Sequence, residues 1–391
     1  MKLQFLNLKQ RYNLKDYKFT LILLVLAVSV IGVFMVGSAN AEYQPRQIMG
    51  VGLGLLAMGV ISLIDYKWIL NFYWLMYVVN IALLLAVIFL GTEANGATRW
   101  LDLGFVQFQP SDLTKLITIL FFARFLADRE EQINKKKTIL EAIGLIIPSL
   151  LLVYKQPSLS ATICIAALFC VIMFMAGLSY KFIGTVLAIT IPTIALVIGI
   201  VVQPNQPFLK DYQQKRILAW LEPEAYATEE AYQQLNSVMA IGSGQLNGKG
   251  YNSDATTSVK NGNFILEPQT DFIFAVAGEE YGFLGCCTII LLLLAISIEC
   301  IRMGLRAKDL SGKIICCGMA SIVSLQSFLN ICVATGIAPN TGTPLPFVSY
   351  GLTSLVSLYL GMGLVLNVGL QSSAYNKEIR KKSVNQKEDY L

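Results

Sequence analysis

The residues best suited to chemistry are carboxylates at the start of a long apolar run. Asp271 ends a polar, glycine-rich stretch, and Glu279 and Glu280 follow about two helical turns deeper. A carboxylate at or inside a membrane span is costly and usually has a functional reason. Asp271 lies nearest the polar side, so it is the best candidate for a general base that takes a proton from a bound hydroxyl.

Three basic residues at expected membrane boundaries suit an anionic ligand: Arg99, Lys115 and Arg216. Arginine and lysine hold phosphate groups and stabilise an anionic leaving group. With Asp271 as the base, these cations predict a site for an amphiphile that carries an anionic head and a nucleophilic hydroxyl.

Lys115, and Trp100 next to Arg99, also have structural alternatives. Pro110 and Asp112 suit a helix start, and Lys115 lies about 6 Å farther along that helix. Its ammonium either snorkels toward the headgroups or faces an anionic substrate in an internal cavity. Trp100 suits either the aromatic belt of the membrane or a platform that stacks on a sugar.

The remaining candidates also have two interpretations each. Glu279 and Glu280 either line the substrate site or pair with a lysine or arginine across the bundle, and the structural interpretation is favoured. Ser349 and Tyr350 follow two prolines, a pattern that predicts a broken or re-entrant segment along a cavity. A structural role for these two residues is favoured over direct chemistry.

Lys249 closes the run Gly242-Ser-Gly244-Gln-Leu-Asn-Gly248-Lys249, which resembles a phosphate-binding P-loop only superficially. The glycine spacing differs and no serine or threonine follows Lys249, so nucleotide binding is not expected. The run is either a turn whose backbone N–H groups approach a lipid pyrophosphate or sugar, or a flexible loop.

The elements that position these residues are membrane helices. Of the 391 residues, 55% are hydrophobic and 14% charged, and the apolar residues form blocks of about 20. No period-two alternation indicates a barrel, so the predicted fold class is all-α, a polytopic integral membrane protein with about ten transmembrane helices. The predicted spans are 19–38, 47–65, 69–91, 110–128, 139–155, 160–178, 181–202, 271–301, 313–336 and 352–371.

The chain is expected to form a single membrane domain, 1–391. Lysine and arginine gather before the first span, after the last, and in loops of the same parity, which places both termini in the cytoplasm. Residues 1–18 and 372–391 are then cytoplasmic tails, and 203–270 is a large extracytoplasmic loop.

Composition also argues against several kinds of site and ligand. The chain has no histidine, and its eight cysteines lie in or beside apolar spans, so disulfides and a thiolate metal site are not expected. The net charge of +5 comes from the basic flanks and suits membrane lipid headgroups rather than nucleic acid.

Several motifs in one order resemble the SEDS family (shape, elongation, division and sporulation), which includes RodA, FtsW and SpoVE. The motifs are Arg99-Trp100-Leu-Asp-Leu-Gly, Gln109-Pro-Ser-Asp-Leu-Thr-Lys115, Gly242-Ser-Gly…Gly248-Lys-Gly, Pro268-Gln-Thr-Asp271-Phe-Ile-Phe-Ala and Pro344-Leu-Pro346-Phe-Val-Ser349-Tyr350-Gly351. The resemblance runs from the first span to the last.

This resemblance implies a peptidoglycan glycosyltransferase that polymerises lipid II at the outer face of the bacterial cytoplasmic membrane, paired with a class B penicillin-binding protein. The family's essential Asp falls on Asp271, its Lys on Lys115 and its Arg on Arg99. Our hypothesis is that Asp271 deprotonates the acceptor's 4-hydroxyl, which attacks the donor's anomeric carbon with inversion. A divalent cation such as Mg²⁺ or Mn²⁺ is compatible with the pyrophosphate, while no nucleotide or organic cofactor is expected.

Two departures from the family pattern leave room for a specialised or weakly active relative. Ser158 stands where many members have an Asp, and Leu352 stands where a Gly is usual. A transporter of the lipid-linked precursor is one rival function, since intramembrane charges would also line its groove. A non-catalytic scaffold for a penicillin-binding protein is the other. The sequence does not separate roles in elongation, division and sporulation.

Overall fold

The computed structural model describes the chain from Tyr17 to Glu388 with gaps. The described residues are 17–94, 97–102, 104, 107–156, 158–182, 184–185, 188, 192, 199, 211–228, 231–253, 264–265 and 267–388. Almost all of the predicted tail 1–18, most of the predicted span 181–202 and the first part of the loop 203–270 lie outside these residues.

Every predicted span other than 181–202 contains a long helix, so the helical membrane fold is confirmed. The helices that correspond to predicted spans are α2 (Phe19–Ala39), α3 (Gln44–Leu63), α5 (Tyr73–Leu90), α6 (Pro110–Ala127), α7 (Lys136–Lys155), α8 (Leu159–Met175), α12 (Ile273–Leu305), α13 (Leu310–Ala334) and α14 (Leu352–Glu388). Among the described residues, seven helices are long and apolar enough to cross a membrane. α14 continues as a helix well past the predicted end of its span at residue 371.

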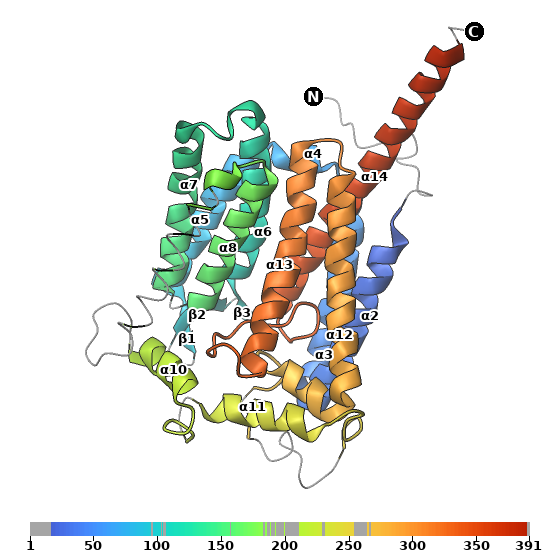
Figure 1. Cartoon of the computed structure of the whole chain (residues 1–391). Coiled ribbons are helices and arrows are strands. Elements are labelled where there is room, and N and C mark those ends of the chain that lie inside the picture. The colour runs from blue at the N-terminus through green and yellow to red at the C-terminus, as the bar shows by residue number, and fades with distance from the viewer. Residues whose placement is uncertain are drawn as a thin grey trace.

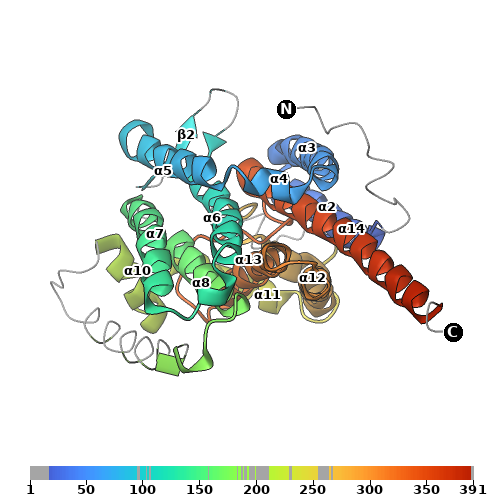
Figure 2. The ribbon, with the colours of Figure 1, turned by 90° about the horizontal axis from the view of Figure 1, so that it is seen from above.

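The bundle has two ends with different contents (Figure 1). α2 begins and α14 ends at one of them, which we call the terminal end; the loop end carries α10 (Asp211–Leu221), α11 (Tyr232–Ser243) and three short strands. α13 lies at the centre and packs against α6, α8, α12 and α14 (Figure 2). Of the apolar windows of α13 and α14, 67% and 72% are buried, against 17% for α5, so α13 and α14 form the interior and α5 the rim.

A small antiparallel sheet at the loop end adds to the predicted all-α architecture. Its strands are β1 (Thr92–Ala94), β2 (Ala97–Asp102) and β3 (Gln107–Phe108), with β2 in the middle. The three strands are two to six residues long and lie between α5 and α6. Such short strands carry a weak sequence signal next to the long apolar runs of the helices.

The described part of the long loop 203–270 folds over the end of α13. Gln234 in α11 donates to Val333 O at 2.8 Å and to Ala338 O at 2.7 Å, and Ser237 donates to Ala334 O at 2.7 Å. The last carbonyls of a helix lack partners within the helix itself. α11 therefore caps α13 with side-chain amides and hydroxyls.

α12 is interrupted near its start by Gly282, which has φ of 63° and ψ of −159°. Residues 245–250 pair with the backbone around this break: Phe283 N donates to Gln245 O at 2.8 Å, and Lys249 N to Glu279 O at 2.9 Å. A Cβ at position 282 would lie 2.4 Å from Gly248 N, so only glycine permits both this φ and this close approach.

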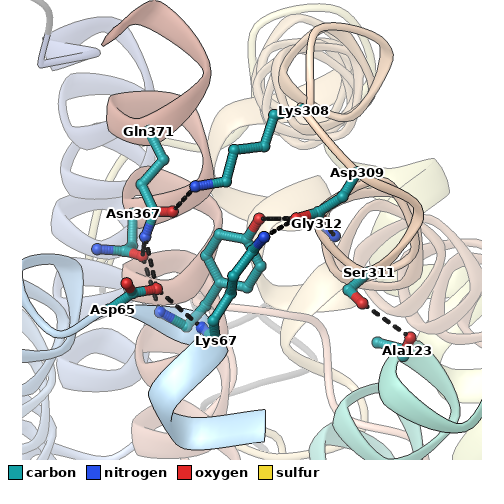
Figure 3. A network of polar contacts seen from close by, with 10 residues as sticks. Asp65, Lys67, Ala123, Lys308, Asp309, Ser311, Gly312, Asn367 and Gln371 are labelled. Atoms are coloured by element: carbon teal, nitrogen blue, oxygen red, sulfur yellow. Dashed lines mark hydrogen bonds and ion pairs between the residues drawn. The ribbon is translucent and has the colours of Figure 1, made fainter. Parts of the chain in front are cut away.

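A network of polar side chains holds the terminal end together (Figure 3). Tyr66 OH, from α4 (Tyr66–Leu70), donates to Asp309 at 2.8 and 2.9 Å, and Lys67 forms an ion pair with the same carboxylate at 2.9 Å. Gln371 in α14 donates to Asp65 at 2.8 Å. Hydrogen bonds and an ion pair thus join the turn after α3 to the turn before α13 and to α14.

Candidate active site

The backbone next to Asp271 is bound to the segment between α13 and α14. Gln269 O accepts a hydrogen bond from Tyr350 N at 2.8 Å, and Thr270 O accepts one from Ser349 Oγ at 2.6 Å. The predicted site residues Ser349 and Tyr350 are therefore brought close to Asp271. The contacts that the structure gives them here support the backbone rather than expose them for chemistry.

The segment between α13 and α14, residues 335–351, is irregular yet enters the interior, as the sequence predicted for a broken segment. Its side chains Leu345, Phe347 and Val348 are each 1% exposed or less. Buried irregular backbone is tolerated in a membrane protein where protein covers it. Here α2 and α14 pack on it, and the Tyr350 N–H of this segment donates to the Asp271 loop at Gln269 O.

Asn330 in α13 joins these two segments directly. Its amide nitrogen donates to Asp271 O at 2.7 Å and to Thr343 O at 2.7 Å, and the side chain is 1% exposed. Asn330 is not among the site residues predicted from the sequence. The signal was available, because a polar amide inside an apolar helix calls for a partner.

The carboxylate of Asp271 is surrounded by charge of both signs. Burial raises the pKa of Asp271 to about 6, opposed by Arg216 and then Arg99, while Glu267 raises it further. Gly342, with φ of 69°, lies against the carboxylate, and a Cβ there would be 3.2 Å from Oδ2. Three predicted site residues, Asp271, Arg99 and Arg216, thus form one electrostatic group.

The two arginines lie on separate elements at the loop end. Arg216 lies on α10, and its Nη1 donates to Asn340 O at 3.5 Å. Arg99 lies on β2 beside Trp100, and both side chains are half-buried. The strand and the loop helix, which are far apart in sequence, therefore supply the positive charge that faces Asp271.

Lys115 is buried within the bundle, only 5% exposed, and does not reach the surface. Its Nζ forms an ion pair with Asp112 at 2.8 Å, one turn earlier in α6. Both line a small pocket between α6, α13 and α14. Gln326 of α13 lines the same pocket. It lies one turn before Asn330, about 6 Å away along the helix axis.

The remaining predicted candidates lie at the break in α12 and contact one another. Lys249 Nζ pairs with Glu279 at 2.8 Å. Glu280 accepts hydrogen bonds from Ser38 and from Asn252 N, the latter at 3.3 Å. The pairing of a buried Glu with a basic residue, which was the structural interpretation, is therefore observed for Glu279.

The described residues contain no group of three or more His, Cys, Asp or Glu side chains that could hold a metal ion. Asp271 faces two arginines, and Glu267 is the acidic group that acts on it. Ser158, which replaces an acidic residue of the family pattern, is 3% exposed and carries no charge. The described donor set does not fit a metal ion held by protein ligands alone.

Comparison with known proteins gives several matches over nearly the whole chain. A family model for FtsW, RodA and SpoVE, described as "Cell cycle protein", matches residues 15–374. Peptidoglycan glycosyltransferase MrdB of Escherichia coli K12 is 34% identical over 367 residues, which cover 92% of this chain and 95% of MrdB. Stage V sporulation protein E of Bacillus subtilis is 31% identical, with 90% and 96% covered.

Two solved structures with the same fold match nearly the whole chain. One is described as "Structural coordination of polymerization and crosslinking by a peptidoglycan synthase complex"; its TM-score is 0.76 at 28% identity, with 91% of this chain and 98% of that chain covered. The other is the rod shape determining protein RodA of Thermus thermophilus, with a TM-score of 0.66, 27% identity, and 90% and 96% covered.

Proposed function

The chain belongs to the family of FtsW, RodA and SpoVE, and from this membership we propose that it polymerises lipid II into β-1,4-linked glycan strands. It is a peptidoglycan glycosyltransferase and a helical, multi-pass membrane protein. The observation that supports the mechanism is the charge arrangement at the loop end, where Arg216 and Arg99 lower the pKa of the Asp271 carboxyl that burial raises.

Asp271 acts as the general base in this proposal. It takes the proton from the 4-hydroxyl of the acceptor sugar, and that oxygen forms a bond to the anomeric carbon of the donor. The bond from this carbon to the lipid pyrophosphate breaks, and the pyrophosphate leaves with the electron pair. One displacement inverts the configuration and needs one base. A carboxyl whose pKa is about 6 is largely ionised at neutral pH and a better proton acceptor than an ordinary Asp.

Arg99 and Arg216 bind the pyrophosphate and stabilise the negative charge that develops as it leaves. Guanidinium groups suit this task because they donate several hydrogen bonds in a fixed plane. Lys115 contributes from the internal pocket, where Asp112 balances its charge in the structure. Trp100 lies beside Arg99 and offers an apolar face to a sugar ring.

A divalent cation fits this proposal as a companion of the substrate. Mg²⁺ commonly keeps several waters and binds through substrate phosphates with few protein ligands. Chelation with EDTA should then reduce the rate of polymerisation while leaving the thermal unfolding midpoint of the protein unchanged. A fall in the midpoint would indicate a structural metal instead.

We also propose a membrane setting and a partner for the protein. We place the protein in the bacterial cytoplasmic membrane, with both termini cytoplasmic and the loop end at the outer face, where lipid II is polymerised. The likeness to a synthase complex that combines polymerisation and crosslinking supports a class B penicillin-binding protein as the partner.

The direct test is glycan synthesis from purified lipid II in detergent. Wild-type protein, alone or with a class B penicillin-binding protein, should give polymer that a muramidase degrades, and Asp271→Asn should give none while still binding lipid II. Glu267→Gln is the matched control, because it removes a neighbouring carboxylate that lies on the same loop but is exposed. Polymer from Asp271→Asn would overturn the assignment of the base. If wild type binds lipid II but makes no polymer in any pairing, a transporter or scaffold becomes the better account.

A further inference from the structure

We propose that Asn330 is a positioning residue for the candidate base, holding the main chain of Asp271 against the segment between α13 and α14. This inference rests on the proposed role of Asp271 and extends it to a residue that does not itself meet substrate. It concerns the precision of the site rather than its chemistry.

The geometry around Asn330 leaves one arrangement of its amide. The two hydrogen bonds to Asp271 O and Thr343 O, both 2.7 Å long, require donors, and the NH₂ group has two. Asn330 Oδ1 is buried and has no hydrogen-bond partner among the described residues. A flipped amide would place that oxygen against two carbonyl oxygens, so the orientation is set by the acceptors.

Asn330 connects the Asp271 backbone to a central helix of the bundle. Ser349 and Tyr350 bind the two preceding carbonyls, Thr270 O and Gln269 O, from the irregular segment between α13 and α14. Asn330 instead projects from α13, the central helix, and is 1% exposed. A side chain fixed on a packed helix holds its partners more precisely than one on a loop.

The amide also determines which surroundings the carboxylate meets. With the loop held, Asp271 is half-buried, and Arg216 of α10, Arg99 of β2 and Glu267 of its own loop act on its charge. Without the anchor, the loop would move away from the interior and the carboxylate would gain water. Burial is the largest cause of the raised pKa, so the pKa of Asp271 should then fall toward its ordinary value of 3.8.

The experiment compares Asn330→Leu and Asn330→Ala with wild type. Leu keeps the volume and removes both donors, and Ala also removes the volume. Ser327→Ala is the control, because Ser327 is buried on the same helix and its Oγ has no hydrogen-bond partner among the described residues. The measurements are kcat and KM for lipid II across pH, with folded sites counted by lipid II binding.

We expect both Asn330 variants to lose about 10- to 100-fold in kcat per folded site, with KM changed less than about threefold. The acid limb of the pH–rate profile should move to lower pH, and Ser327→Ala should behave as wild type. If Asn330→Leu does not accumulate, Asn330→Ser, which keeps one donor, gives the same comparison with a smaller expected loss.

Two results would overturn the inference. One is wild-type kcat per folded site in the Asn330 variants. The other is a loss of folded protein with an acid limb that has not moved, because a purely structural role predicts that pattern. Asp271→Asn, assayed in parallel, separates the two proposals: if it remains active the general-base assignment fails, whereas if it is inactive and Asn330→Leu is normal, only the positioning role fails.

Discussion

Asp271 and its charged neighbours define the chemistry at the scale of single residues. Burial raises the pKa of the carboxyl, and two arginines hold the increase to a value of about 6. A fully buried carboxyl without these cations would be protonated at neutral pH and could not accept a proton. The arginines that we propose to bind the leaving group therefore also favour the ionised form of the proposed base.

Substitution of the neighbours should move the acid limb of activity in opposite directions. Arg216→Gln removes a charge that lowers the pKa of Asp271, so the limb should shift to higher pH and the maximal rate should fall. Glu267→Gln removes a charge that raises this pKa, so the limb should shift to lower pH. The pH dependence of kcat/KM for lipid II measures both shifts. Shifts of the same sign in the two variants would contradict the arrangement of charges.

At the scale of elements, the break in α12 explains candidates that the sequence could not assign. Residues 245–250 pair with the backbone at Gly282, and this places the Lys249 ammonium beside Glu279. The Gly-rich run is thus bound to the backbone of α12 in the structure. It forms hydrogen bonds with the α12 backbone at the turn where the helix is interrupted.

This ion pair should be asymmetric in its contribution to stability. Glu279 is 3% exposed and Lys249 is 19% exposed. Lys249→Met leaves a buried carboxylate without its ion-pair partner and should cost about 3 kcal/mol. Glu279→Gln leaves a lysine that can turn to water and should cost about 1 kcal/mol. Unfolding midpoints in detergent would measure both values.

The same pair of variants also tests the alternative role of Lys249. If Lys249 binds substrate, Lys249→Met should raise KM for lipid II and leave the unfolding midpoint unchanged. Equal midpoints for wild type and both variants would therefore contradict the structural account. An unaltered KM together with the expected loss of stability would support it.

At the scale of the whole molecule, the sequence was sufficient for the helices of the described spans, and it marked Asp271 as the candidate base. Long apolar blocks have few structural solutions in a bilayer, so the spans and the broken segment before α14 follow from hydropathy and proline placement. Asp271 was recognisable because a charge at a membrane boundary is unusual. Hydropathy predicts the spans, the prolines predict the broken segment, and the charge at a membrane boundary marks Asp271 as a candidate.

Local sequence signals did not predict the contacts between distant segments. Arg216 and Arg99 meet the same carboxylate because α10 and β2 fold over one end of the bundle, and neither helix nor strand encodes that meeting alone. Asn330 was missed because its partners are backbone carbonyls at positions 271 and 343. The sequence also left two interpretations of Lys115, and the fold places it inside the bundle beside Asp112.

The measurement that tests the central claim most directly is the rate of glycan synthesis by the wild-type protein between about pH 4.5 and 8, per folded site. The account predicts a rate that falls as pH drops through about 6, where the Asp271 carboxyl becomes protonated. Recovery on return to neutral pH would exclude acid denaturation as the cause. A rate that stays constant down to pH 4.5, with lipid II still bound, would contradict the assignment of Asp271 as the general base.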